Sequence, residues 1–187
     1  RDIKTNRIIS KEIKETSGGI TFSLDDKYIF YSKLDENHRA RKIYRHEIGN
    51  YESEDELIFE EKSEAFTVSI GISSDEKYYF INTSDHNTSE QYYFKSDEEK
   101  PNPKLIIKRE KGIIYSVSSW NGKFYNHTNK EAEDFKIDFS ESLENQNWKS
   151  FIAPKDEVLI GGCTFLENWI IRSETSNALD KLFVKNI

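Results

Sequence analysis

Short runs of aromatic and β-branched residues alternate with polar clusters along the whole chain. The clearest unit is residues 23–30, Ser-Leu-Asp-Asp-Lys-Tyr-Ile-Phe, in which a polar turn precedes an apolar run. Asp suits a tight turn because its side chain bonds the following main chain, and aromatic or β-branched residues suit a pleated strand. The unit therefore predicts a β-hairpin.

Looser copies of this unit return three more times. The turns start at Asp25, Asp75, Asn121 and Glu167, so the spacings are 50, 46 and 46 residues. A period of roughly 40 to 50 residues with several strands per repeat is typical of β-propeller blades. The pattern predicts an all-β propeller segment of about four blades, each with four antiparallel strands.

The repeats divide the chain into a remnant, three complete blades and an incomplete blade. Residues 1–17 are interpreted as the end of a preceding blade, with an outer strand that runs to about Ile13. Gly18 and Gly19 interrupt the pattern, and a new inner strand is predicted from Ile20. The predicted blades cover residues 18–64, 65–111, 112–155 and 156–187, and the last blade stops in its third strand.

Small residues gather in the first strand of each later repeat. Gly within a strand often marks the close approach of another backbone, as expected where blades converge on a central axis. We therefore expect these strands to line the propeller channel; the small residues are Ser69, Gly71, Ser73, Ser116, Ser118, Gly161 and Gly162.

Composition favours a folded β-protein that does not bind nucleic acid. Hydrophobic residues make up only 35% of the chain, but 13% are aromatic, and one buried ring contributes roughly 1.5 to 3 kcal/mol. The net charge of -7 and the lack of a basic stripe argue against a phosphate-backbone partner.

Acidic residues concentrate at 52–56, Glu60, Glu61 and Glu64. We interpret them as a solvated loop and strand edge, with an attractive field for cationic peptides as the alternative.

Cys163 is the only cysteine, so no intrachain disulfide can form and nothing indicates an oxidising compartment. No apolar run approaches the roughly 18 to 20 residues that a membrane helix needs, and the charged residues 1–14 do not resemble a signal peptide. A cytoplasmic location without a membrane partner is expected. Because the chain has no methionine, we also expect it to be a fragment of a longer protein.

The sequence contains no catalytic, metal or cofactor signature. The nearest approach to the nucleophile elbow G-x-S-x-G is residues 71–75, which lack the second Gly and precede no predicted helix. Phosphate-binding glycine loops are absent, and acidic residues are too numerous for sequence to identify a glycosidase pair. Structural roles are expected for the histidines, which lack metal-ligand spacing: His38, His46, His86 and His127. No cofactor and no catalytic residue is predicted.

The segment 35–41, Asp-Glu-Asn-His-Arg-Ala-Arg, places acids, bases and an imidazole between two predicted strands. Local ion pairing and turn formation explain such a loop, and a partner-facing role is the alternative. The candidate interdomain or gating residues are Asp35, Glu36, His38, Arg39 and Arg41.

This loop also carries a resemblance to a known family. Residues 34–39, Leu-Asp-Glu-Asn-His-Arg, with 42–49 and 57–62, resemble the propeller of the oligopeptidase B (protease II) group in the prolyl oligopeptidase family. Shorter matches follow at 88–90, 115–117, 124–125, 134–136 and Trp148. Ala40 stands where the family pattern has Pro, and this departure is expected to loosen the loop.

The resemblance implies a seven-bladed propeller that caps a C-terminal α/β-hydrolase domain carrying the catalytic Ser, Asp and His. It implies a parent serine peptidase that cleaves short peptides after Arg or Lys, with the propeller gating access to the active site. None of those catalytic residues transfers to a position in this chain, so the segment is expected to be inactive alone. The alternatives are a free-standing propeller that binds proteins or peptides, and a propeller glycosidase.

About half of a seven-bladed ring leaves strand edges and apolar faces that invite self-association. The N-terminal strands of one copy are expected to complete the C-terminal sheet of another. The predicted homo-oligomer contacts are Ile3, Ile8, Ile9, Leu182 and Val184.

Overall fold

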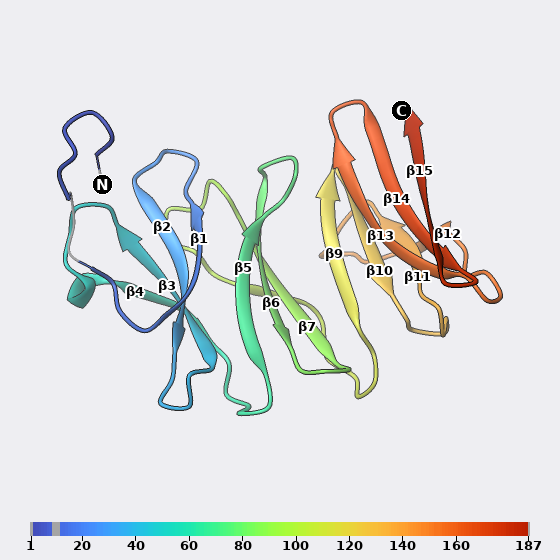
Figure 1. The fold of residues 1–187 in the computed structure, drawn as a ribbon, viewed down its shortest axis with the longest axis horizontal. Helices are drawn as coiled ribbons and strands as arrows, with labels where there is room; N and C mark the ends of the chain where they lie inside the picture. Colours follow the sequence, from blue (N-terminus) through green and yellow to red (C-terminus); the bar gives the residue numbers. More distant parts are fainter. Residues whose placement is uncertain (1, 9–11, 187) are drawn as a thin grey trace. The chain divides into compact units, whose positions relative to one another are not determined.

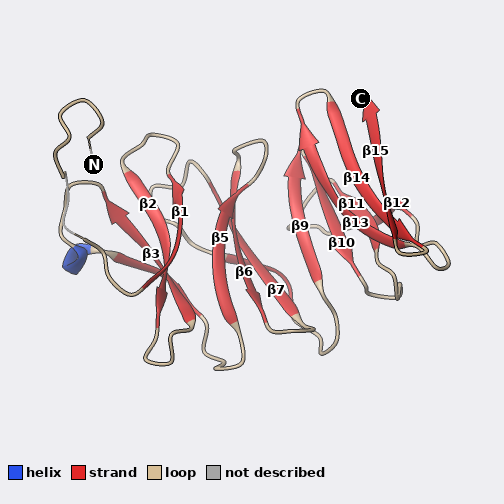
Figure 2. Ribbon diagram, viewed as in Figure 1, coloured by secondary structure: helices blue, strands red, loops and turns tan. Residues whose placement is uncertain are grey.

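The computed structural model of the protein describes residues 2–8 and 12–186. Strands dominate this part of the chain, and its only helical element is the short 3-10 helix η1 (Glu52–Glu54), as Figure 1 and Figure 2 show. Within the described residues the strands form four antiparallel sheets, three with four strands and one with three. This is the fold class that the sequence predicts.

Each sheet is built from strands that are consecutive in sequence. The first contains β1 (Thr16–Phe22), β2 (Tyr28–Leu34), β3 (Ala40–Glu47) and β4 (Glu56–Glu60). The second contains β5 (Thr67–Ile72), β6 (Tyr78–Ser84), β7 (Ser89–Lys95) and β8 (Lys104–Ile107). The third contains β9 (Tyr115–Trp120), β10 (Lys123–Thr128), β11 (Lys136–Ser140) and β12 (Lys149–Ile152). The fourth contains β13 (Leu159–Leu166), β14 (Trp169–Ser176) and β15 (Leu179–Asn186). This meander is the strand order of propeller blades.

Two compact units share the chain, and the division between them passes through the second sheet. Unit 1 comprises residues 1–72, 78–85 and 92–105, and unit 2 comprises residues 73–77, 86–91 and 106–187.

The repeated turn has the same construction in the first two sheets. The Ser23 hydroxyl donates to Asp25 Oδ1 at 2.7 Å, and Asp26 takes a left-handed φ of 57°. In the second sheet Ser73 donates to Asp75 Oδ1, also at 2.7 Å. The Asp side chains therefore hold both turns by local hydrogen bonds, as the sequence pattern predicts.

The β9–β10 turn reaches the same hairpin by another route. Asn121 and Gly122 have φ values of 50° and 74° and lie between the paired residues Trp120 and Lys123. Two successive positive φ values define the type I′ turn that suits the strand twist, and Asn-Gly is its preferred sequence.

Each unit has an aromatic and aliphatic core. In unit 1 the rings of Phe30 and Phe94 lie 4.8 Å and 5.1 Å from the ring of Tyr79. In unit 2 the Trp120 and Phe165 rings stack at 5.6 Å. The buried core residues of unit 1 are Phe30, Ile43, Val68, Tyr79, Ile81 and Phe94. Those of unit 2 are Trp120, Tyr125, Ile137, Ile160, Phe165 and Ile170.

Only one of the strand glycines that were expected to mark the close approach of another blade is closely approached, and its neighbour is Ser173 of the adjacent strand β14 in the same sheet. A Cβ at Gly161 would lie 2.0 Å from Ser173 Oγ, where the β13–β14 register shifts between Ile160 and Cys163. At Gly71 and Gly162 an added Cβ would meet no heavy atom within 4 Å, so the expectation is wrong there.

One of the two N-terminal strand predictions is wrong, and the other stays a prediction. The outer strand predicted to run to about Ile13 includes residues 9–11, which lie outside the described residues, while Ile8 and residues 12–13 lie in no strand. The first inner strand begins at Thr16 rather than Ile20, because Gly18, with a φ of 86°, admits a register shift instead of ending the strand.

In the described ranges, residues 2–8 and 12–186, we find no helix with the length and apolar character to cross a bilayer.

Candidate functional site

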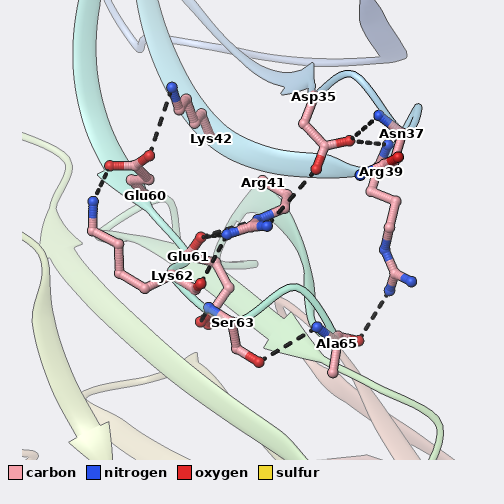
Figure 3. Close-up of polar contacts among 10 residues, drawn as sticks. All are labelled: Asp35, Asn37, Arg39, Arg41, Lys42, Glu60, Glu61, Lys62, Ser63 and Ala65. Atoms are coloured by element: carbon pink, nitrogen blue, oxygen red, sulfur yellow. Dashed lines mark hydrogen bonds and ion pairs between the residues drawn. The ribbon is translucent and has the colours of Figure 1, made fainter.

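Four of the predicted gating residues lie in the β2–β3 loop, and Arg41 is the second residue of β3. Asp35 organises the loop (Figure 3). Asp35 Oδ1 accepts hydrogen bonds from the main-chain N–H groups of Asn37 and Arg39, both at 2.9 Å. The N–H of His38 donates to the Asp35 carbonyl at 3.0 Å, and His38 takes a φ of 57°. These bonds close a compact turn whose shape depends on one carboxylate.

The two arginines reach from this loop to the chain that follows β4. The Arg41 guanidinium donates to the Glu61 carbonyl at 3.1 and 2.8 Å, and to the Lys62 carbonyl at 2.9 Å. Arg39 Nη2 donates to the Ala65 carbonyl at 2.9 Å. Figure 3 shows both side chains directed at the segment 61–65. The arginines thus fasten the loop to the connection between the first and second sheets.

The electrostatics favour an ionised Asp35. The hydrogen bond from Arg39 N holds the pKa of the Asp35 carboxyl below its usual range, with help from Asn37 N and the nearby charge of Arg41. Arg41 Nη1 lies 3.8 Å from Asp35 Oδ2, and both side chains are partly buried. The carboxylate therefore holds the turn and also orients the guanidinium.

A second, more exposed charge group borders the loop. Glu60 lies between the ammonium groups of Lys42 and Lys62 (Figure 3), and its contact with Lys62 is the main cause of its lowered pKa. Lys62 is 81% exposed, so water screens this pair and its contribution to stability is small.

The five predicted residues divide into two groups. Asp35, Arg39 and Arg41 are partly buried and take part in the contacts that shape the loop. Glu36 and His38 are exposed. The structure brings the first group together and leaves the second at the surface.

The other half of this site could not be predicted from the sequence. The acceptors for the arginines are main-chain carbonyls of Glu61, Lys62 and Ala65, some 20 to 26 residues further along the chain. Carbonyl acceptors leave no trace in residue identity, so no sequence signal marks them. The buried Glu61 carboxylate caps the turn by accepting from Ser63 N at 2.8 Å.

The other candidate groups have structural partners. Ser73, considered as an elbow nucleophile, donates to Asp75 within its turn. His46 Nδ1 lies 2.6 Å from Asp55 Oδ1 inside unit 1. The His127 imidazole contacts the Ile160 carbonyl through Nε2 at 2.7 Å, and burial lowers its pKa. Across residues 2–8 and 12–186 we find no cluster of three or more His, Cys, Asp or Glu able to hold a metal ion.

Part of the acidic segment 52–56 is internal. The Asp55 side chain is 3% exposed and accepts from the Tyr31 hydroxyl at 2.8 Å as well as contacting His46. Glu52 forms an ion pair with Lys33, which lowers the pKa of Glu52. Of the four acidic residues in the segment only Glu54 and Glu56 are exposed, so the segment is less open to a cationic partner than its sequence suggests.

Comparison with known proteins points to one family. The family model "Prolyl oligopeptidase, N-terminal beta-propeller domain" matches residues 1–187. The chain is 29% identical to Protease 2 of Moraxella lacunata over 87% of its length, and 24% identical to dipeptidyl aminopeptidase BI of Pseudoxanthomonas mexicana over 98%.

A solved structure shows the same fold. Oligopeptidase B from Trypanosoma brucei, in a closed form with covalently bound antipain, superimposes with a TM-score of 0.89 over 95% of this chain, at 22% identity. The chain spans 26% of that structure and 26% of each of the two curated relatives. The likeness therefore concerns about a quarter of each relative.

Proposed function

Because the chain belongs to the prolyl oligopeptidase N-terminal β-propeller family, we propose that it is the non-catalytic propeller segment of an oligopeptidase B-like serine peptidase. The main support for the proposal is that the family model matches residues 1–187 and that the curated relatives are about four times as long as this chain. In this proposal the partner is a C-terminal α/β-hydrolase domain of the same parent chain. The parent's substrates are short peptides cleaved after Arg or Lys.

We assign the β2–β3 loop a role in gating peptide access or domain closure. Asp35, Arg39 and Arg41 fix the loop through the contacts in Figure 3. Glu36 and His38 then offer a charge and an imidazole at the surface to the partner domain or an entering peptide. The contacts that hold the loop support this assignment, since an ordered loop loses less conformational entropy when its exposed side chains bind a partner.

The test uses the complete parent enzyme with Glu36→Gln and His38→Asn. Asn tolerates the left-handed backbone of position 38, so both variants should keep the loop. We expect altered substrate binding or steady-state turnover with an unchanged rate of single-turnover chemistry. Glu54→Gln, which removes another exposed carboxylate of unit 1, is the matched control. A chemical step that falls as far as turnover, with binding intact, would contradict the gating role.

A second test addresses the lack of catalysis. The chain alone should not hydrolyse basic dipeptide or tripeptide amides, because its nearest elbow-like Ser73 is engaged in a turn. Turnover that follows the purified chain and responds to a serine-directed inhibitor would refute this.

The flanking gene sequence distinguishes the proposed peptidase segment from a free-standing peptide-binding propeller. An in-frame G-x-S-x-G region supports the peptidase.

Location and assembly belong to the same proposal. We infer a cytoplasmic parent from the lack of a disulfide pair around Cys163.

Self-association draws support from the exposure of Ile3, Ile8, Leu182 and Val184, while Ile9 lies outside the described residues. Light scattering across a wide dilution series checks it, and a compact monomer at every concentration would refute it.

A further inference from the structure

The β9–β10 turn differs chemically from its counterparts in the first two sheets. Asn121 and Gly122 are both exposed, and they form the only Asn-Gly pair in the sequence. Across residues 2–8 and 12–186, neither the Asn121 side chain nor the Gly122 N–H has a hydrogen-bond partner. A Cβ added to Gly122 would meet nothing within 4 Å. The amide side chain and the following main-chain nitrogen are thus both unrestrained and open to water.

The corresponding groups of the first two turns are engaged. In the first, the N–H of Asp26 donates to the Ser23 carbonyl at 3.1 Å, and the Asp25 carboxylate accepts from the Ser23 hydroxyl. In the second, the N–H of Glu76 donates to a Ser73 carbonyl at 2.9 Å. A nitrogen that already donates a hydrogen bond must break it before it can attack a neighbouring side chain.

We propose that Asn121 is a site of spontaneous deamidation. The main-chain nitrogen of Gly122 attacks Cγ of Asn121 and a new C–N bond forms. The Cγ–Nδ2 bond breaks, and the side-chain nitrogen leaves as ammonia with the proton that the Gly122 nitrogen gives up. The product is a five-membered succinimide. Water then opens either carbonyl of the ring, and the result is aspartate or isoaspartate at position 121. The net reaction consumes one water and releases one ammonia, and it needs no oxidant, enzyme or cofactor.

Other asparagines lack this combination of features. Asn102 precedes Pro103, which has no N–H to attack. Asn126 is buried. The Asn129 side chain accepts from Ile114 N at 2.8 Å and donates to the Gly112 carbonyl at 3.0 Å.

The fourth repeat provides an internal comparison. Asn168 lies in the β13–β14 turn but precedes Trp169, whose side chain hinders the approach of its main-chain nitrogen.

The two products have different consequences. Aspartate at 121 gives this turn an acid, as its counterparts have at Asp25, Asp75 and Glu167. Isoaspartate instead routes the main chain through the side-chain carbon and adds a methylene to a two-residue loop. Because turn length sets hairpin register, the pairing of Trp120 with Lys123 should loosen.

The experiment follows deamidation of the intact protein during incubation at neutral to mildly alkaline pH. Peptide mapping by mass spectrometry locates each converted asparagine, and electron-transfer fragmentation separates aspartate from isoaspartate. We expect Asn121 to convert before Asn168 and every other asparagine. Another asparagine converting first would overturn the proposal.

A matched variant tests the structural reason. Asp25→Asn with Asp26→Gly places Asn-Gly in a turn whose nitrogen is hydrogen-bonded. We expect it to convert about fivefold to tenfold more slowly than Asn121, because roughly one hydrogen bond must break first. Asp75→Asn with Glu76→Gly repeats the test should the first variant fold poorly. Equal deamidation rates at Asn121 and in the variant turn, whose main-chain nitrogen is hydrogen-bonded, would overturn the structural argument.

Discussion

The first two sheets fasten the start of the third strand to the chain beyond the fourth strand, but they use different chemistry. In the first sheet Arg41, the second residue of β3, donates to the main-chain carbonyls of Glu61 and Lys62. In the second sheet Glu90, the second residue of β7, accepts from the main chain and guanidinium of Arg109 at 2.6 to 2.9 Å. The charge on the strand is thus reversed between the two sheets.

The two sheets make the same connection, but the contacts differ in how much stability is lost when one partner is removed. A main-chain carbonyl is neutral and can accept a hydrogen bond from another donor. The Glu90 side chain, by contrast, is 5% exposed, and its negative charge is stabilised by the Arg109 guanidinium. A buried carboxylate that loses its partner has a large desolvation penalty. The second fastening should therefore be the more sensitive to substitution.

Arg109→Met should have the largest effect. We expect a loss of about 3 kcal/mol in the free energy of unfolding, because the buried Glu90 carboxylate would lose its hydrogen bonds from the guanidinium. Urea denaturation followed by tryptophan fluorescence measures it. Glu90→Gln in the same background should recover part of the loss, since it removes the buried charge. A double variant no more stable than Arg109→Met would show that the carboxylate charge is not the cause.

Arg41→Met should cost less, about 2 kcal/mol, because the hydrogen bonds that it removes end on neutral carbonyls. The Asp35 carboxylate, which also faces Arg41, keeps its two main-chain hydrogen bonds. The same urea titration measures the loss. Arg41→Lys is the control, since it retains the charge but cannot reproduce the planar fork. A loss equal to that of Arg109→Met would erase the distinction between the two fastenings.

Asp35→Asn should remove a pH dependence that belongs to the first sheet. The folded state lowers the pKa of Asp35, mainly through the hydrogen bond from Arg39 N. Its contribution is therefore complete above the unfolded value, near 3.8, and is lost as the pH falls through the folded pKa. We expect the stability difference between wild type and Asp35→Asn to shrink on acidification. Glu36→Gln removes a neighbouring carboxylate that is exposed, and an equal pH dependence there would argue against the loop bonds as the cause.

The smallest effect should come from the exposed side of the loop. Glu36→Gln and His38→Asn should each change the free energy of unfolding by less than about 0.5 kcal/mol, as is usual for surface substitutions. Thermal and urea unfolding both test this. A larger loss at either position would mean that these side chains help to hold the fastening and do not simply face solvent.

The sequence by itself determined the repeat and most of its strands. The recurrence from Asp25 to Glu167 set the period, and each of the four predicted turns joins two paired antiparallel strands. This succeeds because turn chemistry and strand propensity act over a few neighbouring residues. The blade boundaries remain predictions, and so does the N-terminal outer strand, because residues 9–11 lie outside the part of the chain that the structure describes.

Only the tertiary structure decided what the candidate residues do. From sequence, Asp35, Glu36, His38, Arg39 and Arg41 formed one equivalent group. Folding placed the segment 61–65 beside them, and the positions of its carbonyls separated the three residues that hold the loop from the two that face solvent. Main-chain groups are the same in every residue, so their availability depends on where distant strands bring them together.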